Sequence, residues 1–253
     1  GSHMFKEGSM VIPGGITCDN AFTTVKVNPD HLGIDVTVYL DAIVEANNGK
    51  GAKVKGQNSE IIGSIKGYLL PPEEGVEEIT LFVKYHDGGV DGSSVEFEDG
   101  EVLILQENIV YGNTSIVSGD TVFTLNSVNA TATGYSVGVA EGVYFIRGTF
   151  VDVASSQIIL DPYNNEPSFR VGFDIVEDIV NADQDQELND NAKGFTNYAA
   201  PGADRLRIQL KLSKKQLTDT DDTSFVELVK IDEGEIKKLQ NKSNYNLIKD
   251  YFA

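Results

Sequence analysis

The sequence predicts a mainly β fold, with antiparallel sheets in a β-sandwich-like arrangement, several hairpins and few short helices. Apolar residues recur with a period of two through most of the chain, as expected for strands with one buried face. The 25 glycines fall mostly between these segments, where tight turns need them. A helical period occurs only near the C-terminus.

The first clear hairpin is expected over residues 78–105. In the segment EITLFVKYH, one face carries Ile79, Leu81, Val83 and Tyr85, and the other carries Thr80, Lys84 and His86. The following Asp87-Gly88-Gly89 can adopt the positive φ angles of a tight turn. The segment SSVEFEDGEVLIL repeats the pattern, with Asp99-Gly100 as the turn between two short strands.

Stronger strands follow in the second half of the chain. Residues 168–180 place one apolar face on a strand, formed by Phe169, Val171, Phe173 and Ile175. Residues 204–212 do the same with Leu206, Ile208, Leu210 and Leu212. Residues 224–231 form a further short strand, and residues 243–253 form a C-terminal helix capped by Ser243 or Asn244.

Composition limits the domain plan and the partners. Residues 1–4 resemble the remnant of an expression tag. The expected domains are a hairpin-rich one over 5–140 and a second β-rich one over 141–253 that ends in the short helix. The net charge of −19 disfavours nucleic acid and anionic membrane surfaces as partners, and no apolar run is long enough for a membrane span.

Catalytic motifs are absent from the sequence, so we expect a protein that is not an enzyme and uses no cofactor. Cys18 is the single cysteine, and its pairing with His31 as nucleophile and base would need support that the sequence does not give. His86 is expected to be solvated. Paired carboxylates for glycoside cleavage stay open as an alternative, although no pair stands out and tryptophan is absent.

An acidic loop, NADQDQELNDN over residues 181–191, offers weak cation ligands. Asp183, Asp185 and Glu187 supply oxygens at alternate positions, which suits Ca²⁺. Leu188 stands where the EF-hand loop requires glycine, so we expect a solvated loop without a metal.

The segment FTNYAAPGADRLRI, residues 195–208, is expected to form a structural corner that presents a docking surface. Pro201 and Gly202 predict a type II turn with positive φ at Gly202, and Asp204 caps it. The following strand sends Leu206 and Ile208 into the core. It thereby holds two arginines on the opposite face, where they pair with nearby carboxylates such as Asp174 or Glu177, or with an acidic partner subunit. The residues assigned to this corner are Phe195, Tyr198, Pro201, Gly202, Asp204, Arg205 and Arg207.

The strings GVYFIRGTFVDV, LDPYNNEPSFRVG and NYAAPGADR, in this order between residues 142 and 212, resemble a family of structural proteins from tailed bacteriophages. Its T4-like members, many from phages of cyanobacteria, are virion proteins of baseplates or tail fibres. The resemblance implies no catalytic residues. It also implies that family members continue beyond a segment like YNLIKDYFA, so we expect this chain to be a short version or the N-terminal part of a longer protein.

The resemblance therefore predicts a non-enzymatic virion structural protein, assembled in the host cytoplasm and located in the phage tail. Its expected partners are other tail or baseplate proteins and further copies of itself, with a trimer as the expected homo-oligomer. The alternative is a tail module that binds or depolymerises host-surface carbohydrate. A calcium-dependent adhesion module is a third reading, which depends on whether the acidic loop binds metal.

Overall fold

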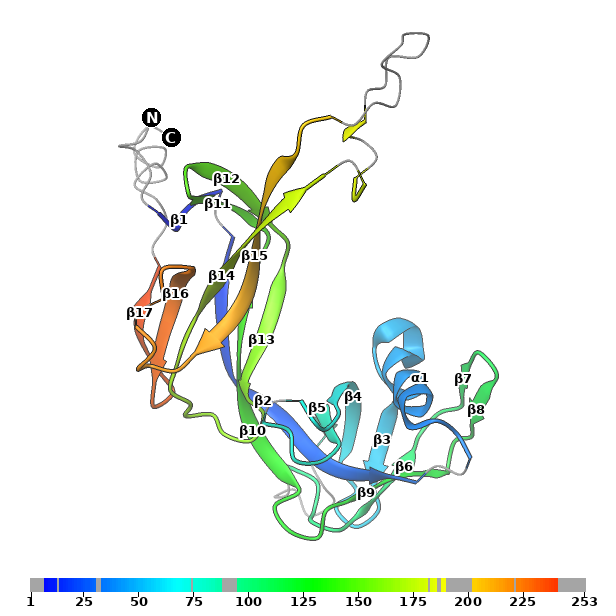
Figure 1. The fold of residues 1–253 in the computed structure, drawn as a ribbon. Coiled ribbons are helices and arrows are strands. Elements are labelled where there is room, and N and C mark those ends of the chain that lie inside the picture. The colour runs from blue at the N-terminus through cyan, green and yellow to red at the C-terminus, as the bar shows by residue number, and fades with distance from the viewer. Residues whose placement is uncertain are drawn as a thin grey trace, which may run out of the picture. The chain divides into compact units, whose positions relative to one another are not determined.

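The computed structural model describes residues 7–12, 14–30, 33–73, 75–87, 95–181, 183–185, 188–189, 202–220 and 222–240. Strands account for 55% of the structure and helix for 7%, and the sheets are antiparallel, so the predicted fold class is confirmed (Figure 1). The helix expected over 243–253 lies outside the described residues.

Contacts divide the chain into two compact units, and each is discontinuous in sequence. Residues 19–136 and 159–167 make up the first, which we call the barrel unit. The remaining residues make up the second, which we call the hairpin unit.

The single domain boundary expected at residue 140 is thus replaced by four cuts, near residues 18, 136, 158 and 167. Three of them fall inside strands: β2 (Ile16–Pro29), β10 (Thr131–Val139) and β13 (Ser156–Asp161). Periodicity continues along such strands without interruption, so it cannot reveal where one unit ends and the next begins.

Six strands close the barrel unit into a ring. In ring order they are β2, β5 (Thr80–Asp87), β4 (Ile62–Leu69), β3 (Lys53–Gly56), β6 (Val102–Leu105) and β9 (Thr121–Leu125). The ring closes because β2 pairs with β5 through residues 23–26 and with β9 through residues 27–29. A small hairpin, β7 (Ile109–Tyr111) and β8 (Thr114–Ile116), follows β6. Closure leaves the ring without free sheet edges.

The barrel core contains the predicted face of β5, because Leu81 and Val83 are buried. Val54, Ile65 and Leu103 contribute from neighbouring strands. The strand expected over residues 93–98 is wrong for the described residues 95–98, which form no strand. Its alternation fails there because Val95 is 71% exposed, while Phe97 packs edge-on against Tyr85.

A helix that the sequence analysis missed, α1 (Val36–Gly49), packs into the barrel core. Asp35 caps its N-terminus, accepting hydrogen bonds from the amides of Thr37 and Val38. Its buried residues are Tyr39, Leu40, Ala42 and Ile43. The Tyr39 hydroxyl donates to the carbonyl of Val122 at 3.0 Å, and burial raises the pKa of this tyrosine.

The hairpin unit contains two sheets. One has the order β15 (Arg205–Lys215), β14 (Phe169–Val180), β16 (Phe225–Asp232), β17 (Glu235–Leu239). The other has the order β1 (Ser9–Ile12), β11 (Gly142–Ile146), β12 (Thr149–Val153). Their shared core is formed by Met10, Val139, Tyr144, Ile146, Val153, Phe173 and Leu228. Three strands predicted from the second half of the sequence, at 168–180, 204–212 and 224–231, are confirmed as β14, β15 and β16.

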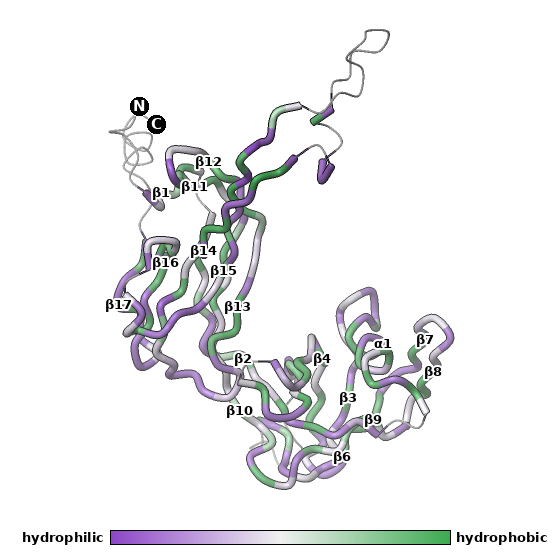
Figure 2. Tube along the Cα trace, in the orientation of Figure 1, coloured by the Kyte–Doolittle hydropathy of each residue, from purple (hydrophilic) through white to green (hydrophobic). Residues whose placement is uncertain are grey.

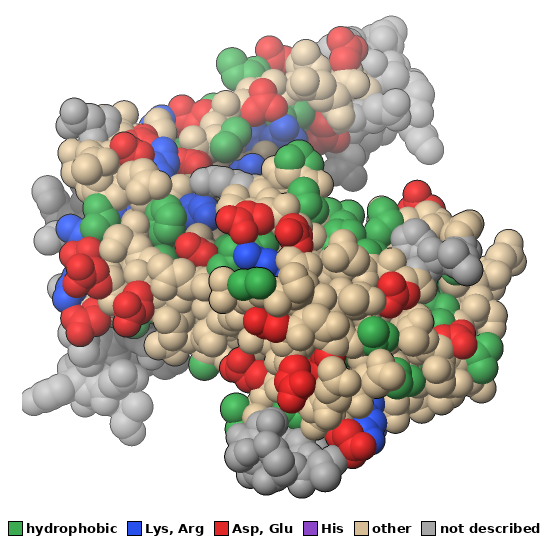
Figure 3. All heavy atoms as spheres, turned by 90° about the horizontal axis from the view of Figure 1, so that it is seen from below, with side chains coloured by type: hydrophobic (Ala, Val, Ile, Leu, Met, Phe, Trp, Pro, Cys, Tyr) green, Lys and Arg blue, Asp and Glu red, His purple; other side chains and the backbone are tan. Residues whose placement is uncertain are grey.

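Acidic side chains are spread over the molecular face drawn in Figure 3, as the net charge of −19 requires. Basic side chains on this face lie beside acidic ones. Most of the ion pairs that involve the described residues join partly exposed groups, so each contributes little to stability.

Candidate functional site

The described residues of the predicted corner, 202–208, lie at the far end of a long hairpin formed by β14 and β15. The two strands pair from Arg170 opposite Lys215 to Val180 opposite Arg205. The register between β16 and β14 ends at Asp174. Within its sheet, the rest of the hairpin is therefore a ribbon of two strands, which runs past β16 and β17 (Figure 1).

One face of this hairpin carries an apolar row that starts in the core and ends in solvent. From root to end, its cross-strand pairs are Phe173–Leu212, Ile175–Leu210, Glu177–Ile208 and Ile179–Leu206. Phe173 is fully buried and contacts Tyr144 edge-on, with 4.9 Å between the ring centroids. At the end, Ile179 is 62% exposed and Leu206 is 64% exposed. Figure 2 shows apolar segments continuing along both strands beyond the core.

The prediction that Leu206 packs into the core is wrong. The alternation places Leu206 on the same face as Ile208, Leu210 and Leu212, which are partly buried against the core. The hairpin extends beyond the elements that cover this face near its root, so the last pair has no cover among the described residues. The alternation of apolar residues therefore identified which face of β15 is apolar, but not how far along the strand that face is buried.

Arg207 pairs with a nearby carboxylate, although not with either of the two that were named as examples. Arg207 pairs with Asp178, its direct cross-strand neighbour, at 2.7 Å, with both side chains about half exposed. Asp174 instead pairs with Lys215 at 3.1 Å. Glu177 pairs with Arg147 at 2.7 Å. We call Asp178, Ile179, Leu206 and Arg207 the hairpin end.

The acidic loop and the two arginines, which the sequence analysis treats separately, line one open pocket of about 380 Å³. Its lining residues are Val180, Gln184, Asp185, Leu188, Arg205, Leu206 and Arg207. Asp183 is exposed and Glu187 lies outside the described residues. No group of three metal-ligating side chains occurs among the residues that the structure describes. Two guanidinium groups beside Asp185 also oppose a bound cation.

Gly202 differs from its prediction, because its φ angle lies outside the positive range of a type II turn. Its amide donates to the carbonyl of Leu188 at 3.1 Å, and a Cβ atom there would lie 2.2 Å from the same oxygen. Glycine is therefore required because the Leu188 carbonyl approaches so closely, and not because the backbone needs a positive φ. Asp204 and Arg205 are exposed, and Phe195, Tyr198 and Pro201 lie outside the described residues.

Comparison with known protein families places this hairpin within a recognised domain. A family model described as "Domain of unknown function (DUF4815)" matches residues 88–253, well over half of the chain. The chain belongs to the DUF4815 family. The matched residues include β14, β15 and the hairpin end. No curated protein and no solved structure matches the chain.

The string LDPYNNEP of this DUF4815 protein, residues 160–167, forms a structural clasp in the barrel unit. Asp161 accepts hydrogen bonds from the amides of Tyr163 and Asn164, which fixes the turn. The hydroxyl of Tyr163 lies 2.7 Å from that of Thr80. The hydroxyl of Thr24, which is fully buried, donates to the carbonyl of Pro162 at 2.7 Å.

Other candidates for chemistry in the DUF4815 chain are not brought together. Cys18 is partly buried, and its hypothetical partner His31 lies outside the described residues. His86 is exposed, as expected. Of the helices that the structure describes, none has the length and apolar character that crossing a membrane requires. The feature that stands out is the exposed apolar pair of the hairpin end.

Proposed function

We propose that this chain is a non-enzymatic structural protein of a tailed-bacteriophage virion, acting in a baseplate or tail-fibre attachment apparatus by assembly and docking. The resemblance of residues 142–212 to virion proteins supports the phage assignment. One structural observation carries the docking role: Ile179 and Leu206 continue a core face into solvent, each more than 60% exposed. Contiguous apolar surface of this kind favours a protein partner.

The chemistry of the hairpin end suits a specific contact. Ile179 and Leu206 lie directly opposite each other across the two strands and form one apolar surface. Asp178 and Arg207 are the adjacent cross-strand pair, which faces the other side of the ribbon. The apolar pair supplies affinity when a partner covers it.

A second copy of the chain is the proposed occupant. The exposed apolar pair Ile179 and Leu206 can be covered by the same pair of another copy. Cyclic symmetry can bring the same apolar pair of several copies together around one axis, and three is the number that the resemblance to tail proteins implies. Positive side chains such as Arg205, Lys211 and Lys214 protect the edge strand β15 against open-ended strand addition. Contact through the apolar face is therefore favoured.

Self-association is tested by sedimentation velocity across a micromolar concentration series. The native chain should form trimers, and the double variant Ile179→Ser/Leu206→Ser should stay monomeric with an unchanged melting temperature. Ile236→Ser on β17 is the matched control, because Ile236 is also exposed, at 48%, in the same sheet. Added salt should strengthen association, since it screens the repulsion between copies that each carry −19 charges. A native chain that is monomeric throughout the series contradicts the proposed contact.

Two further measurements address the rest of the proposal. Mass spectrometry of purified particles of a phage that encodes the chain should detect it as a virion component. A screen against esters, peptides and bacterial polysaccharides should show no turnover. Polysaccharide cleavage that is abolished by one Asp→Asn or Glu→Gln substitution would overturn the non-enzymatic assignment and favour the depolymerase alternative.

A further inference from the structure

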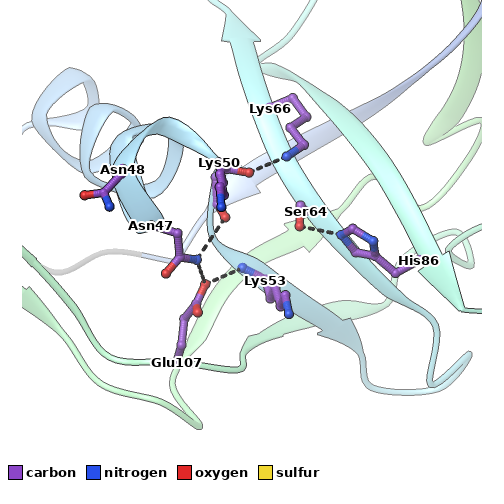
Figure 4. Close-up of a pocket in the computed structure, with 9 residues that line it drawn as sticks. Asn47, Asn48, Lys50, Lys53, Ser64, Lys66, His86 and Glu107 are labelled. Carbon is purple, nitrogen blue, oxygen red and sulfur yellow. Dashed lines mark hydrogen bonds between the residues drawn. The ribbon is translucent and has the colours of Figure 1, made fainter.

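An open pocket in the barrel unit gathers positive charge where the chain is otherwise acidic. It has a volume of about 480 Å³ and lies where the C-terminal end of α1 meets β3, β4 and β5 (Figure 4). The residues that line it are Asn47, Asn48, Lys50, Gly51, Lys53, Ser64, Lys66, His86 and Glu107. All of them belong to the barrel unit.

The backbone at the end of α1 builds one wall of the pocket. Asn47 and Asn48 both have a φ of 58°, a left-handed conformation that asparagine tolerates better than most residues. Gly51 has a φ of 79°, and a Cβ atom there would overlap the carbonyl of Ile65. The chain therefore leaves the helix through a tight loop that is fixed against β4.

The one carboxylate in the pocket is held by neutral donors. Oε1 of Glu107 accepts a hydrogen bond from the side-chain amide of Asn47 at 2.6 Å and from the backbone amide of Lys53 at 2.9 Å. Lys66 donates its ammonium group to the carbonyl of Lys50. In the part of the chain that the structure describes, none of the three lysines forms an ion pair.

The concentration of charge is unusual for this unit. Its basic residues are six lysines, at positions 26, 50, 53, 55, 66 and 84, and it contains no arginine. Three of the six line the pocket against a single glutamate. Like charges held together repel, and an anion placed between them removes that repulsion. In a chain with 39 acidic residues, these lysines nevertheless form no ion pair among the described residues.

We propose that this pocket binds a tetrahedral oxyanion, a phosphate or sulfate group that is either free or esterified to a small molecule. Ammonium groups of lysine bind such groups as point charges. Asn48 and His86 add hydrogen-bonding groups, and Ser64 orients His86 through a contact of 2.6 Å between its hydroxyl and Nε2. The volume also accommodates the body of a small ester such as a sugar phosphate.

Binding is tested by isothermal titration calorimetry at low ionic strength, with inorganic phosphate and inorganic sulfate as probes and chloride as the reference. The variant Lys50→Gln/Lys66→Gln should bind phosphate at least about tenfold more weakly, because two charge-assisted contacts are lost. Lys55→Gln is the matched control: this lysine lies on β3 outside the pocket and pairs with Glu60 at 3.4 Å. It should bind like the native chain.

A charge change of the opposite sign gives an independent test. Glu107→Gln keeps an acceptor oxygen for Asn47 and removes the negative charge, so phosphate should bind several-fold more tightly. Thermal melts establish that each variant folds. If the native chain binds neither phosphate nor a sugar phosphate, or if Lys50→Gln/Lys66→Gln binds as tightly as the native chain, the proposed site is wrong.

The source of the oxyanion is resolved by comparing glucose 6-phosphate, glucose and inorganic phosphate. Tighter binding of glucose 6-phosphate than of inorganic phosphate, with no binding of glucose, supports an esterified ligand. Equal binding of the two phosphates supports a free ion. Either result is independent of the hairpin end, because salt weakens this ionic contact and strengthens the apolar one.

Discussion

Replacing Glu101 by glutamine is expected to destabilise the barrel unit strongly, although the two side chains have almost the same shape. Glu101 is 1% exposed. Its Oε2 accepts hydrogen bonds from the amides of Asn58 and Ser59 at 3.0 and 3.1 Å. Its Oε1 accepts from the Ser59 hydroxyl and the Glu98 amide, both at 2.8 Å. All four donors therefore point at one carboxylate.

The magnitude follows from this geometry. Glutamine has one acceptor oxygen, so two of the four donors lose their acceptor in either orientation of the amide. Each lost hydrogen bond to a charged group corresponds to about 1.5–3 kcal/mol. Relief of the desolvation of a buried charge offsets part of that loss. We expect a net decrease of about 3 kcal/mol in the free energy of unfolding, or roughly 10 °C in the melting temperature.

Urea denaturation followed by circular dichroism measures this change. Glu98→Gln is the control, because Glu98 is an exposed neighbour and its loss removes the same negative charge. If Glu101→Gln is no less stable than Glu98→Gln, the buried carboxylate does not organise the loops around it and the reasoning fails.

Three further predictions concern the hairpin unit. Gly202→Ala should accelerate hydrogen exchange at residues 175–180 without lowering the global melting temperature, since the new Cβ atom would displace the Leu188 carbonyl at the end of the ribbon; unchanged exchange would contradict the contact. Tyr144→Phe should raise stability by about 1 kcal/mol in chemical denaturation, because this buried hydroxyl has no hydrogen-bond partner among the described residues. Burial raises the pKa of Glu227, but hydrogen bonds from Arg170 and Lys238 outweigh it and hold the pKa below its ordinary value. At a pH above the ordinary pKa of glutamate, the ion pairs of Glu227 therefore stabilise the fold. This stabilisation is lost as the pH falls through the lowered pKa of Glu227. Below about pH 4, the melting temperature of Glu227→Gln should therefore decline less steeply with pH than that of the native chain.

Local patterns predicted individual strands better than their connections. The alternation in residues 168–180 and 204–212 reflects the backbone geometry of single strands, and it identified the correct faces of β14 and β15. Ring closure depends on β2 pairing with β9, roughly a hundred residues later, and no local pattern encodes such a pairing.

The helix α1 could have been found. Val36, Tyr39, Leu40 and Ile43 have the i, i+3, i+4, i+7 spacing of a helix, and Asp35 is a good N-cap. The β-branched residues Val36, Thr37 and Val38 conceal it, because they favour strands by local propensity. Tertiary burial of the apolar face overrides that preference.

The two sites illustrate the same limit. The sequence indicated that Arg207 and Leu206 lie on opposite faces of a strand. It could not show that the strand extends beyond the elements that bury its apolar face near the root of the hairpin. The basic pocket draws on residues from position 47 to position 107, which come together only through the pairing of β3, β4 and β5. In the sequence, no motif around these lysines marks them as binding residues.

The clasp formed by residues 159–167 has a consequence for biosynthesis. The ribosome first makes residues 1–18 of the hairpin unit and residues 19–136 of the barrel unit. It then makes residues 137–158 of the hairpin unit, and only afterwards the segment that reaches Thr24 and Thr80. The barrel unit therefore cannot be completed until residues 159–167 emerge, which happens after part of the hairpin unit has left the ribosome. Translation and folding of the two units are interleaved, and a gene truncated at codon 140 would encode neither unit complete.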